Sequence, residues 1–215
     1  MFQLMKKSLV LKCYTPDFTV YETAPLTMKS NKNLFNESDQ PRSIRTCYGY
    51  ISALKKSITV PNWSEFSVVG TDEGMNYNYP EQNRTWVESH NDPCLKAQDI
   101  QVTKICSPWA IESNHNIDIL LSAHVLNTSP MRVPSGCMTF HRFHQLNMFN
   151  YVHKKAHDYS VPFGLPLVSL FPLTERNIVL ETYYDPDKFH ELNYRSKSNP
   201  FFRGGRIKLG RLLGW

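Results

Sequence analysis

The sequence predicts a mainly β fold of the α+β class with a sandwich-like core, and three observations support this prediction. Apolar and polar residues alternate from Ile117 to Val125, which is the pattern of a strand with one buried face. Five prolines between positions 130 and 172 separate further short apolar runs, as is typical of strands joined by turns. Because no glycine-rich phosphate-binding loop follows any of these runs, a Rossmann-like or P-loop fold is not expected.

One helix is expected before the main group of strands, over about residues 41–57. Pro41 suits the first turn of a helix, where its missing N–H costs no hydrogen bond. Apolar residues then recur at the spacing of a single buried helix face, at Ile44, Cys47, Tyr48, Ile51 and Leu54. We therefore predict one amphipathic helix that packs on a sheet.

The remaining segments predict a single domain with extended arms. Residues 1–40 are predicted as an N-terminal arm or hairpin, with β-type residues at 9–11 and 18–21. Residues 70–97 are polar and rich in Asn, Gly and Pro, so we expect a long loop there. Strands are expected at 58–61, 66–69, 100–103, 117–125, 136–140, 148–153, 166–171 and 178–181. The β-rich domain is thus assigned to residues 1–187, and residues 188–215 to a C-terminal tail.

The positive charge is concentrated in that tail. The net charge of the 215 residues is +5 with histidines neutral. Residues 188–215 hold seven basic residues and one acidic residue, a net of +6, which leaves −1 for residues 1–187. A protein that binds nucleic acid over its whole surface would spread this charge more evenly. No apolar run reaches the roughly 18 residues of a membrane span, so no membrane association is expected.

Cysteine usage and the first residues predict synthesis in a cytoplasm. The five cysteines form no C-x-x-C pair, and their odd number favours reduced thiols. We expect them to be buried and inert, as in the apolar surroundings of Cys106 and Cys137. The opening residues place charge after a very short apolar stretch, which is the reverse of a secretion signal.

Four histidines offer a candidate metal site. His141 and His144 are three positions apart, and His153 and His157 are four apart, spacings that share one face of a helix. The flanking residues predict strands and turns instead, and residues three apart on a strand face opposite sides. The sequence therefore favours surface or loop histidines, with a metal site as the alternative and no cofactor predicted. No G-x-S-x-G or H-E-x-x-H motif is present, so no catalytic residue is nominated.

The C-terminal tail interleaves aromatic and apolar residues with cations. We predict partner contacts from Phe201, Phe202, Arg203, Arg206, Lys208, Arg211 and Trp215. Such a segment can insert aromatic anchors into a partner protein or add a strand to its sheet. Two alternatives stay open: the tail packs on its own domain, or it binds nucleic acid or an anionic membrane through charge and stacking.

Four short motifs follow one another between Cys106 and Pro172. They are Ser107-Pro108-Trp109-x-Ile111, Ser135-Gly136-Cys137-Met138-x-Phe140, Asn147-Met148-Phe149 and Val161-Pro162-Phe163-Gly164-Leu165-Pro166-Leu167-Val168-Ser169-Leu170-Phe171-Pro172. Together they resemble an uncharacterised family of bacterial and tailed-phage proteins. The helix at 41–57, followed by Ile58-Thr59-Val60-Pro61, fits the N-terminal half of the same family. The later motifs are also similar to the β-clip fold of trimeric dUTPases, which implies a β-clip core.

The dUTPase activity itself is not implied, because its residues are missing. In those enzymes an Asp on the strand after the glycine contacts deoxyribose, and a Tyr-Arg-Gly stretch follows. Here Thr139 or Phe140 stands at the acidic position, and Gly204-Gly205 is the nearest approach to the C-terminal glycine-rich motif. The resemblance leaves a scaffold without the activity.

These observations together predict a non-enzymatic assembly protein. The family resemblance implies a minor head, connector or tail component of a tailed-phage virion, made in the host cytoplasm. Its C-terminal tail would bridge to other virion or assembly proteins, or to further copies of the same chain. The rival hypothesis is a β-clip or cupin-like enzyme, or a nucleotide- or metal-binding protein.

Overall fold

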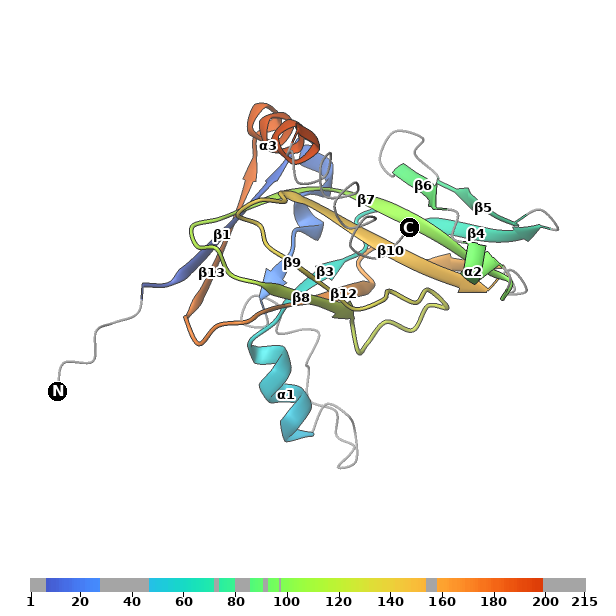
Figure 1. The fold of residues 1–215 in the computed structure, drawn as a ribbon, viewed down its shortest axis with the longest axis horizontal. Helices are drawn as coiled ribbons and strands as arrows, with labels where there is room; N and C mark the ends of the chain where they lie inside the picture. The colour runs from blue at the N-terminus through green and yellow to red at the C-terminus, as the bar shows by residue number, and fades with distance from the viewer. Residues whose placement is uncertain are drawn as a thin grey trace, which may run out of the picture.

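The strands form three sheets in the computed structural model, which describes residues 7–27, 47–71, 74–79, 86–90, 93–96, 98–153 and 158–198 (Figure 1). Sheet I has the order β10-β7-β1-β13, with β6 also on β7, and consists of β1 (Leu9–Thr15), β6 (Trp86–His90), β7 (Ile100–Ser113), β10 (Gln145–His153) and β13 (Ile178–Tyr184). Sheet II has the order β2-β3-β12-β8-β9, from β2 (Leu26–Thr27), β3 (Ile58–Pro61), β8 (Ile119–Ala123), β9 (Gly136–Met138) and β12 (Pro166–Pro172). Sheet III has the order β11-β4-β5, from β4 (Phe66–Thr71), β5 (Gly74–Asn78) and β11 (Tyr159–Val161). The prediction of a mainly β, α+β fold is confirmed.

Strand β1 lies inside sheet I and joins its two halves. It pairs parallel with β13 on one side and antiparallel with β7 on the other. Strand β7 is long enough to take β1 at its C-terminal end and β6 at its N-terminal end along the same edge. The prediction of an N-terminal arm is therefore wrong for residues 9–15, which form an internal strand.

One apolar cluster connects all three sheets. Alternate residues of β1 (Leu9, Leu11 and Cys13) are fully buried in it, as the period of two along a strand requires. Trp109 of β7 and Phe66 of β4 are also almost completely buried, at 0 % and 1 % exposure. The opposite side chains of β1 point to the outer face of sheet I, which leaves that face available for other contacts.

The predicted amphipathic helix differs from the observed one. Helix α1 covers Tyr48–Lys55, and residues 41–46 lie outside the described part of the chain. Of the described residues on the proposed buried face, only Leu54 is buried, whereas Cys47 is exposed and Tyr48 is 84 % exposed. The spacing of apolar residues predicted the helix itself. However, α1 projects from the sheets, and no described sheet or helix packs over the predicted face (Figure 1).

Three other predictions also need correction. Residues 70–97 are not one loop, because they include the end of β4, strands β5 and β6, and helix α2 (Pro93–Lys96). Residues 188–198 do not belong to a tail, because they continue helix α3 (Pro186–Ser198), which packs on sheet I. Residues 18–21 form the start of a 3₁₀ helix, η1 (Phe18–Thr23), where a strand was expected. The Asp17 carboxylate accepts from the Thr19 N–H at 2.9 Å and so caps that helix.

The predicted and observed bounds agree best for strands flanked by turns or prolines. Those expected at 58–61, 66–69 and 166–171 are present as β3, β4 and β12, whereas the strand expected at 117–125 is limited to Ile119–Ala123. Buried thiols are confirmed for Cys13 and Cys106 but are wrong for Cys137, Cys47 and Cys94, which are exposed. Among the described residues, no helix combines the length and the apolar character needed to cross a bilayer.

Candidate functional site

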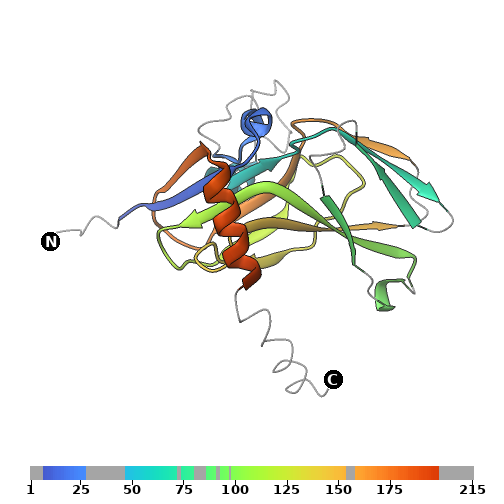
Figure 2. The same ribbon diagram turned by 90° about the horizontal axis from the view of Figure 1, so that it is seen from above.

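Helix α3 lies across the outer face of sheet I and forms one wall of the candidate site (Figure 2). Asp185 caps its start, since its carboxylate accepts from the Lys188 N–H at 2.9 Å, and Pro186 occupies the first helical position. The helix is held by a small apolar cluster in which Phe189 and Leu192 pack on Tyr14 and Ala110 of the sheet. This cluster fixes the position of the polar residues that follow along the helix.

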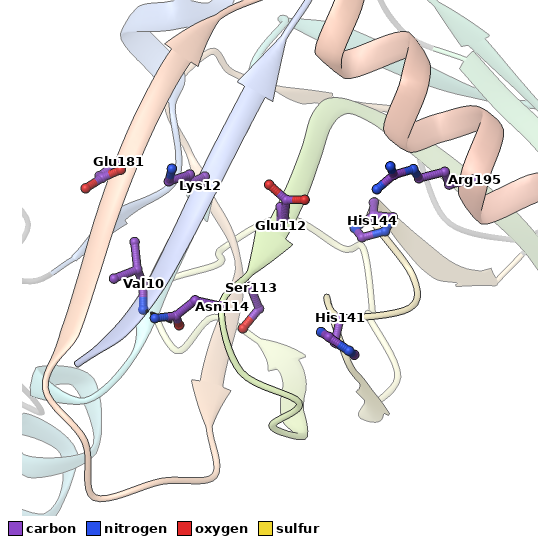
Figure 3. A pocket seen from close by; sticks show the side chains of 9 residues that line it. All are labelled: Val10, Lys12, Glu112, Ser113, Asn114, His141, His144, Glu181 and Arg195. Carbon is purple, nitrogen blue, oxygen red and sulfur yellow. Dashed lines mark hydrogen bonds between the residues drawn. The ribbon is translucent and has the colours of Figure 1, made fainter. Parts of the chain in front are cut away.

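A pocket of about 660 Å³ opens beside α3 on the same face of sheet I (Figure 3). Its lining comes from β1, β7 and the bend after it, β13, α3 and the turn before β10. It consists of Val10, Lys12, Glu112, Ser113, Asn114, His141, His144, Glu181 and Arg195. Val10 is the only aliphatic residue in this lining, so the pocket suits a hydrophilic occupant more than an apolar one.

A row of alternating charge crosses the pocket floor. Lys12 of β1 is in register with Glu112 of β7 on one side and with Glu181 of β13 on the other. Neighbouring strands lie about 4.8 Å apart, so the ammonium group stands between two carboxylates. The Glu181 carboxylate also accepts a hydrogen bond of 2.7 Å from the Tyr183 hydroxyl. Arg195 adds a second positive charge from the helix, so two cations face the two carboxylates of this row.

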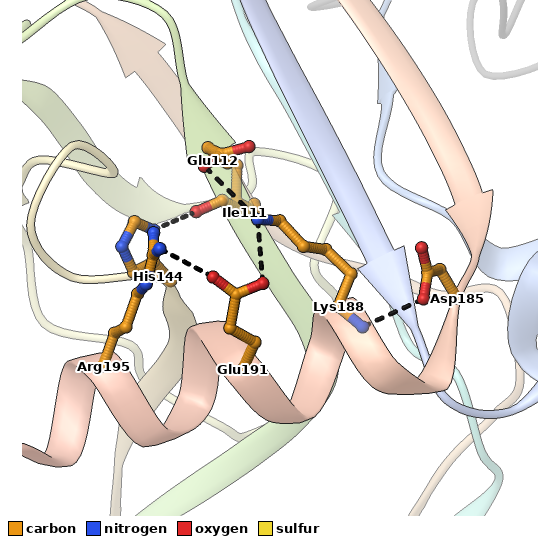
Figure 4. Close-up of polar contacts among 7 residues, drawn as sticks. All are labelled: Ile111, Glu112, His144, Asp185, Lys188, Glu191 and Arg195. Atoms are coloured by element: carbon orange, nitrogen blue, oxygen red, sulfur yellow. Dashed lines mark hydrogen bonds and ion pairs between the residues drawn. The ribbon is translucent and has the colours of Figure 1, made fainter.

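His144 is the chemically distinctive member of the pocket. The residue is only 6 % exposed, and its Nδ1 lies 3.0 Å from the Ile111 carbonyl oxygen (Figure 4). Because a carbonyl can only accept, Nδ1 carries the proton and Nε2 is left as a hydrogen-bond acceptor. Burial lowers the pKa of His144 below its ordinary value, which favours this neutral form. The imidazole can therefore accept a proton or a hydrogen bond from a molecule in the pocket.

Contacts with α3 hold His144 in place at the wall of the pocket that the helix forms. The His144 backbone N–H donates to the Ser196 hydroxyl at 2.9 Å, and that hydroxyl donates to the Leu192 carbonyl at 3.1 Å. Ion pairs add to this attachment: Glu191 lies 2.7 Å from Arg195 and 3.1 Å from Lys188, and Lys188 lies 3.9 Å from Glu112 (Figure 4). The hydrogen bond from Lys188 lowers the pKa of Glu191.

The turn that carries His141 and His144 agrees with the expectation of surface or loop histidines, but His144 is buried where exposure was expected. His141 and His144 lie in a turn and its exit before β10, and both border the same pocket. His153 is exposed at the end of β10, and His157 lies outside the described residues. Within the described ranges, no three His, Cys, Asp or Glu side chains come together as metal ligands. Buried His124 lies elsewhere, with its Nε2 3.3 Å from the Thr59 hydroxyl.

The free edge of sheet I lies next to the pocket. Strand β13 ends the sheet, and no other described strand pairs with its outer side. An aromatic patch of Phe18, Tyr21 and Tyr184 borders this edge, with ring centroids 6.2 Å apart for Phe18 and Tyr21 and 5.8 Å apart for Phe18 and Tyr184. These three side chains are 68 %, 40 % and 52 % exposed, respectively.

Sequence reasoning missed the pocket because its residues come from distant segments. Lys12, Glu112, Glu181 and Arg195 have no shared local spacing, and only strand pairing and the docking of α3 bring them together. The predicted partner-binding residues, from Phe201 to Trp215, lie outside the described residues.

No protein-family model and no curated protein sequence matches the chain.

Proposed function

We propose that this chain is a non-enzymatic assembly protein, a minor head, connector or tail component of a tailed-phage virion. Its C-terminal segment, residues 199–215, binds a neighbouring subunit. The observation that carries the proposal is the free edge of β13 with its exposed aromatic patch. Open strand edges and grouped exposed aromatic rings are features through which proteins bind other proteins.

The composition of residues 199–215 supports the same function. The segment contains four cations and no acidic residue, together with the aromatic residues Phe201, Phe202 and Trp215. Aromatic and arginine side chains contribute most of the binding energy in many protein interfaces. Since α3 is anchored through Phe189 and Leu192, this segment starts from a fixed place on the body.

Deleting residues 199–215 is expected to abolish incorporation into particles while the body still folds. The deletion removes the partner-binding residues but leaves every described helix and strand intact. Incorporation is measured by the amount of the protein in purified particles, and folding by circular dichroism. A matched control replaces four exposed lysines on the body by Gln, at Lys7, Lys55, Lys56 and Lys96, and should incorporate normally. Normal incorporation of the truncated chain would refute the proposal.

A second candidate function is favoured by the pocket and its unprotonated His144 Nε2. On this alternative the chain is a β-clip or cupin-like enzyme, or binds a nucleotide or metal. It predicts that Zn²⁺ or a nucleotide added to the purified protein shifts the His144 Nε2 resonance in NMR spectra. His144→Gln should then abolish binding in calorimetry, whereas a matched change of exposed His190 should not. The absence of any shift with either probe would remove this alternative.

A further inference from the structure

The open edge of β13 presents a defined set of unpaired backbone groups. The Leu9 N–H donates to the Asn177 carbonyl at 2.9 Å, and the Asp185 N–H donates to the Thr15 carbonyl at 3.1 Å. In a parallel ladder these two bonds mean that odd-numbered residues of β13 face β1. The N–H and C=O groups of Ile178, Leu180 and Thr182 therefore point away from the sheet. Among the described residues, only the Thr182 carbonyl has a partner there, the Tyr21 hydroxyl at 3.2 Å.

The side chains of β13 define what kind of strand could be added. Ile178 and Leu180 face inward, where they pack against the main core cluster, and both are only partly buried. Glu181 faces outward beside Lys12. An added strand would extend the core with apolar side chains on its inner face, and would best carry a cation on its outer face.

The C-terminal segment has this pattern. Residues 206–209 read Arg-Ile-Lys-Leu, so apolar and cationic side chains alternate with the period of a strand. Segment 199–215 carries a charge of +4. Residues 175–188 around the β13 edge hold four acidic and two basic residues, which gives −2. Pattern and charge of residues 206–209 therefore complement the part of the edge from Ile178 to Glu181.

The course of α3 favours a second copy of the chain as the occupant. The helix begins directly after β13 and crosses sheet I toward β10, where Ser196 bonds to the His144 backbone (Figure 2). Helix α3 thus ends near β10, at the edge of sheet I opposite to β13. A return to the β13 edge of its own chain would require a crossing of the whole sheet, whereas the edge of a second copy carries no such constraint. The inserted C-terminal segment (the donor) and the β13 edge that receives it (the acceptor) would lie on opposite edges of sheet I. This is the arrangement of a head-to-tail assembly.

We propose that residues 206–209 of one copy add a strand to the open β13 edge of a second copy. The proposal rests on the function proposed above, in which the C-terminal segment binds a neighbouring subunit, and it names that subunit as the same protein. Ile207 and Leu209 extend the core beyond Ile178 and Leu180, and Lys208 lies against Glu181. Repetition of this contact produces a ring or an open array of copies.

Mixing two complementary variants tests the proposal. The chain without residues 199–215 lacks the donor, and Leu180→Pro lacks the acceptor, because proline removes an outward N–H and blocks strand addition. In light scattering coupled to size exclusion, the wild type is expected to form oligomers and each variant alone to be monomeric. An equimolar mixture should form a heterodimer, since one intact tail and one intact edge remain. A wild type that stays monomeric, or a mixture without heterodimer, would overturn the proposal.

A charge exchange provides a test that does not depend on the proline variant. Glu181→Lys and Lys208→Glu should each weaken self-association about 2- to 5-fold, and the double variant should recover most of the loss. Glu65→Lys, at an exposed residue away from β13, is the matched control and should have no effect. Failure of the double variant to recover contradicts the assigned contact. If the purified protein never self-associates but deletion of the tail still prevents incorporation, the copy-to-copy contact is wrong and the assembly function stands.

Discussion

Leu192→Ala is expected to destabilise the attachment of α3 by about 2–4 kcal/mol, the usual cost of truncating a fully buried leucine. Leu192 is completely buried and, with Phe189, forms the helix side of the small apolar cluster under α3. Because that cluster is separate from the main core, the loss should appear as local opening of α3 before global unfolding. Hydrogen exchange of the α3 amides, compared with those of β12, measures the effect.

The same helix offers a matched control for this prediction. Tyr194 is 73 % exposed, so Tyr194→Ala should change α3 protection by no more than about 0.5 kcal/mol. Opening of α3 by Leu192→Ala also releases the Ser196 contact to His144 and should disturb the pocket. Unchanged exchange rates in the Leu192 variant would show that α3 does not depend on this cluster.

Acidification from pH 7 to pH 4 is expected to remove about 3 kcal/mol of stability through His124 alone. This side chain is 2 % exposed, and burial lowers its pKa from 6.5 to about 4. Because the pKa of His124 is lower in the folded than in the unfolded state, the neutral imidazole contributes its full share to the free energy of unfolding above pH 6.5. That contribution is lost as the pH falls toward 4, because the unfolded chain binds the proton first. Urea unfolding at a series of pH values measures the loss.

Two substitutions separate the titration of His124 from its hydrogen bonds. The His124 Nδ1 accepts from the Leu126 N–H at 3.0 Å, a bond that the side-chain oxygen in His124→Asn can replace. This variant should be less stable at pH 7 but should lose much of the acid dependence. Thr59→Val removes the partner of Nε2 and leaves the buried imidazole, so its acid dependence should persist. Equal pH slopes for the wild type and His124→Asn would contradict the assignment.

Local sequence signals predicted the strands but not their neighbours. Strands β3, β4 and β12 follow from apolar runs bounded by turns and prolines, which act over a few residues. The position of β1 between β7 and β13 could not be predicted, since pairing between distant segments leaves no local period. For α1, spacing predicted a helix correctly, yet spacing carries no information on whether another layer covers Tyr48.

The candidate site was even less accessible to sequence reasoning. The density of histidines drew attention to His141 and His144, and the structure places both beside one pocket. Their partners Lys12, Glu112 and Arg195 were not identified, because each looks like an ordinary surface charge in its own segment. The charge imbalance of the last residues was visible from composition alone, whereas an acceptor for that segment required the strand order of sheet I.

The parallel pairing of β1 with β13 has a consequence for synthesis on the ribosome. Leu9 and Leu11 leave the exit tunnel about 170 residues before their neighbours Ile178 and Leu180. Sheet I therefore cannot be completed while the segments between them are translated, and the apolar side of β1 stays without its β13 neighbour during that time. Such late pairing of distant strands slows folding, and it prolongs the time during which aggregation-prone intermediates are exposed to chaperones.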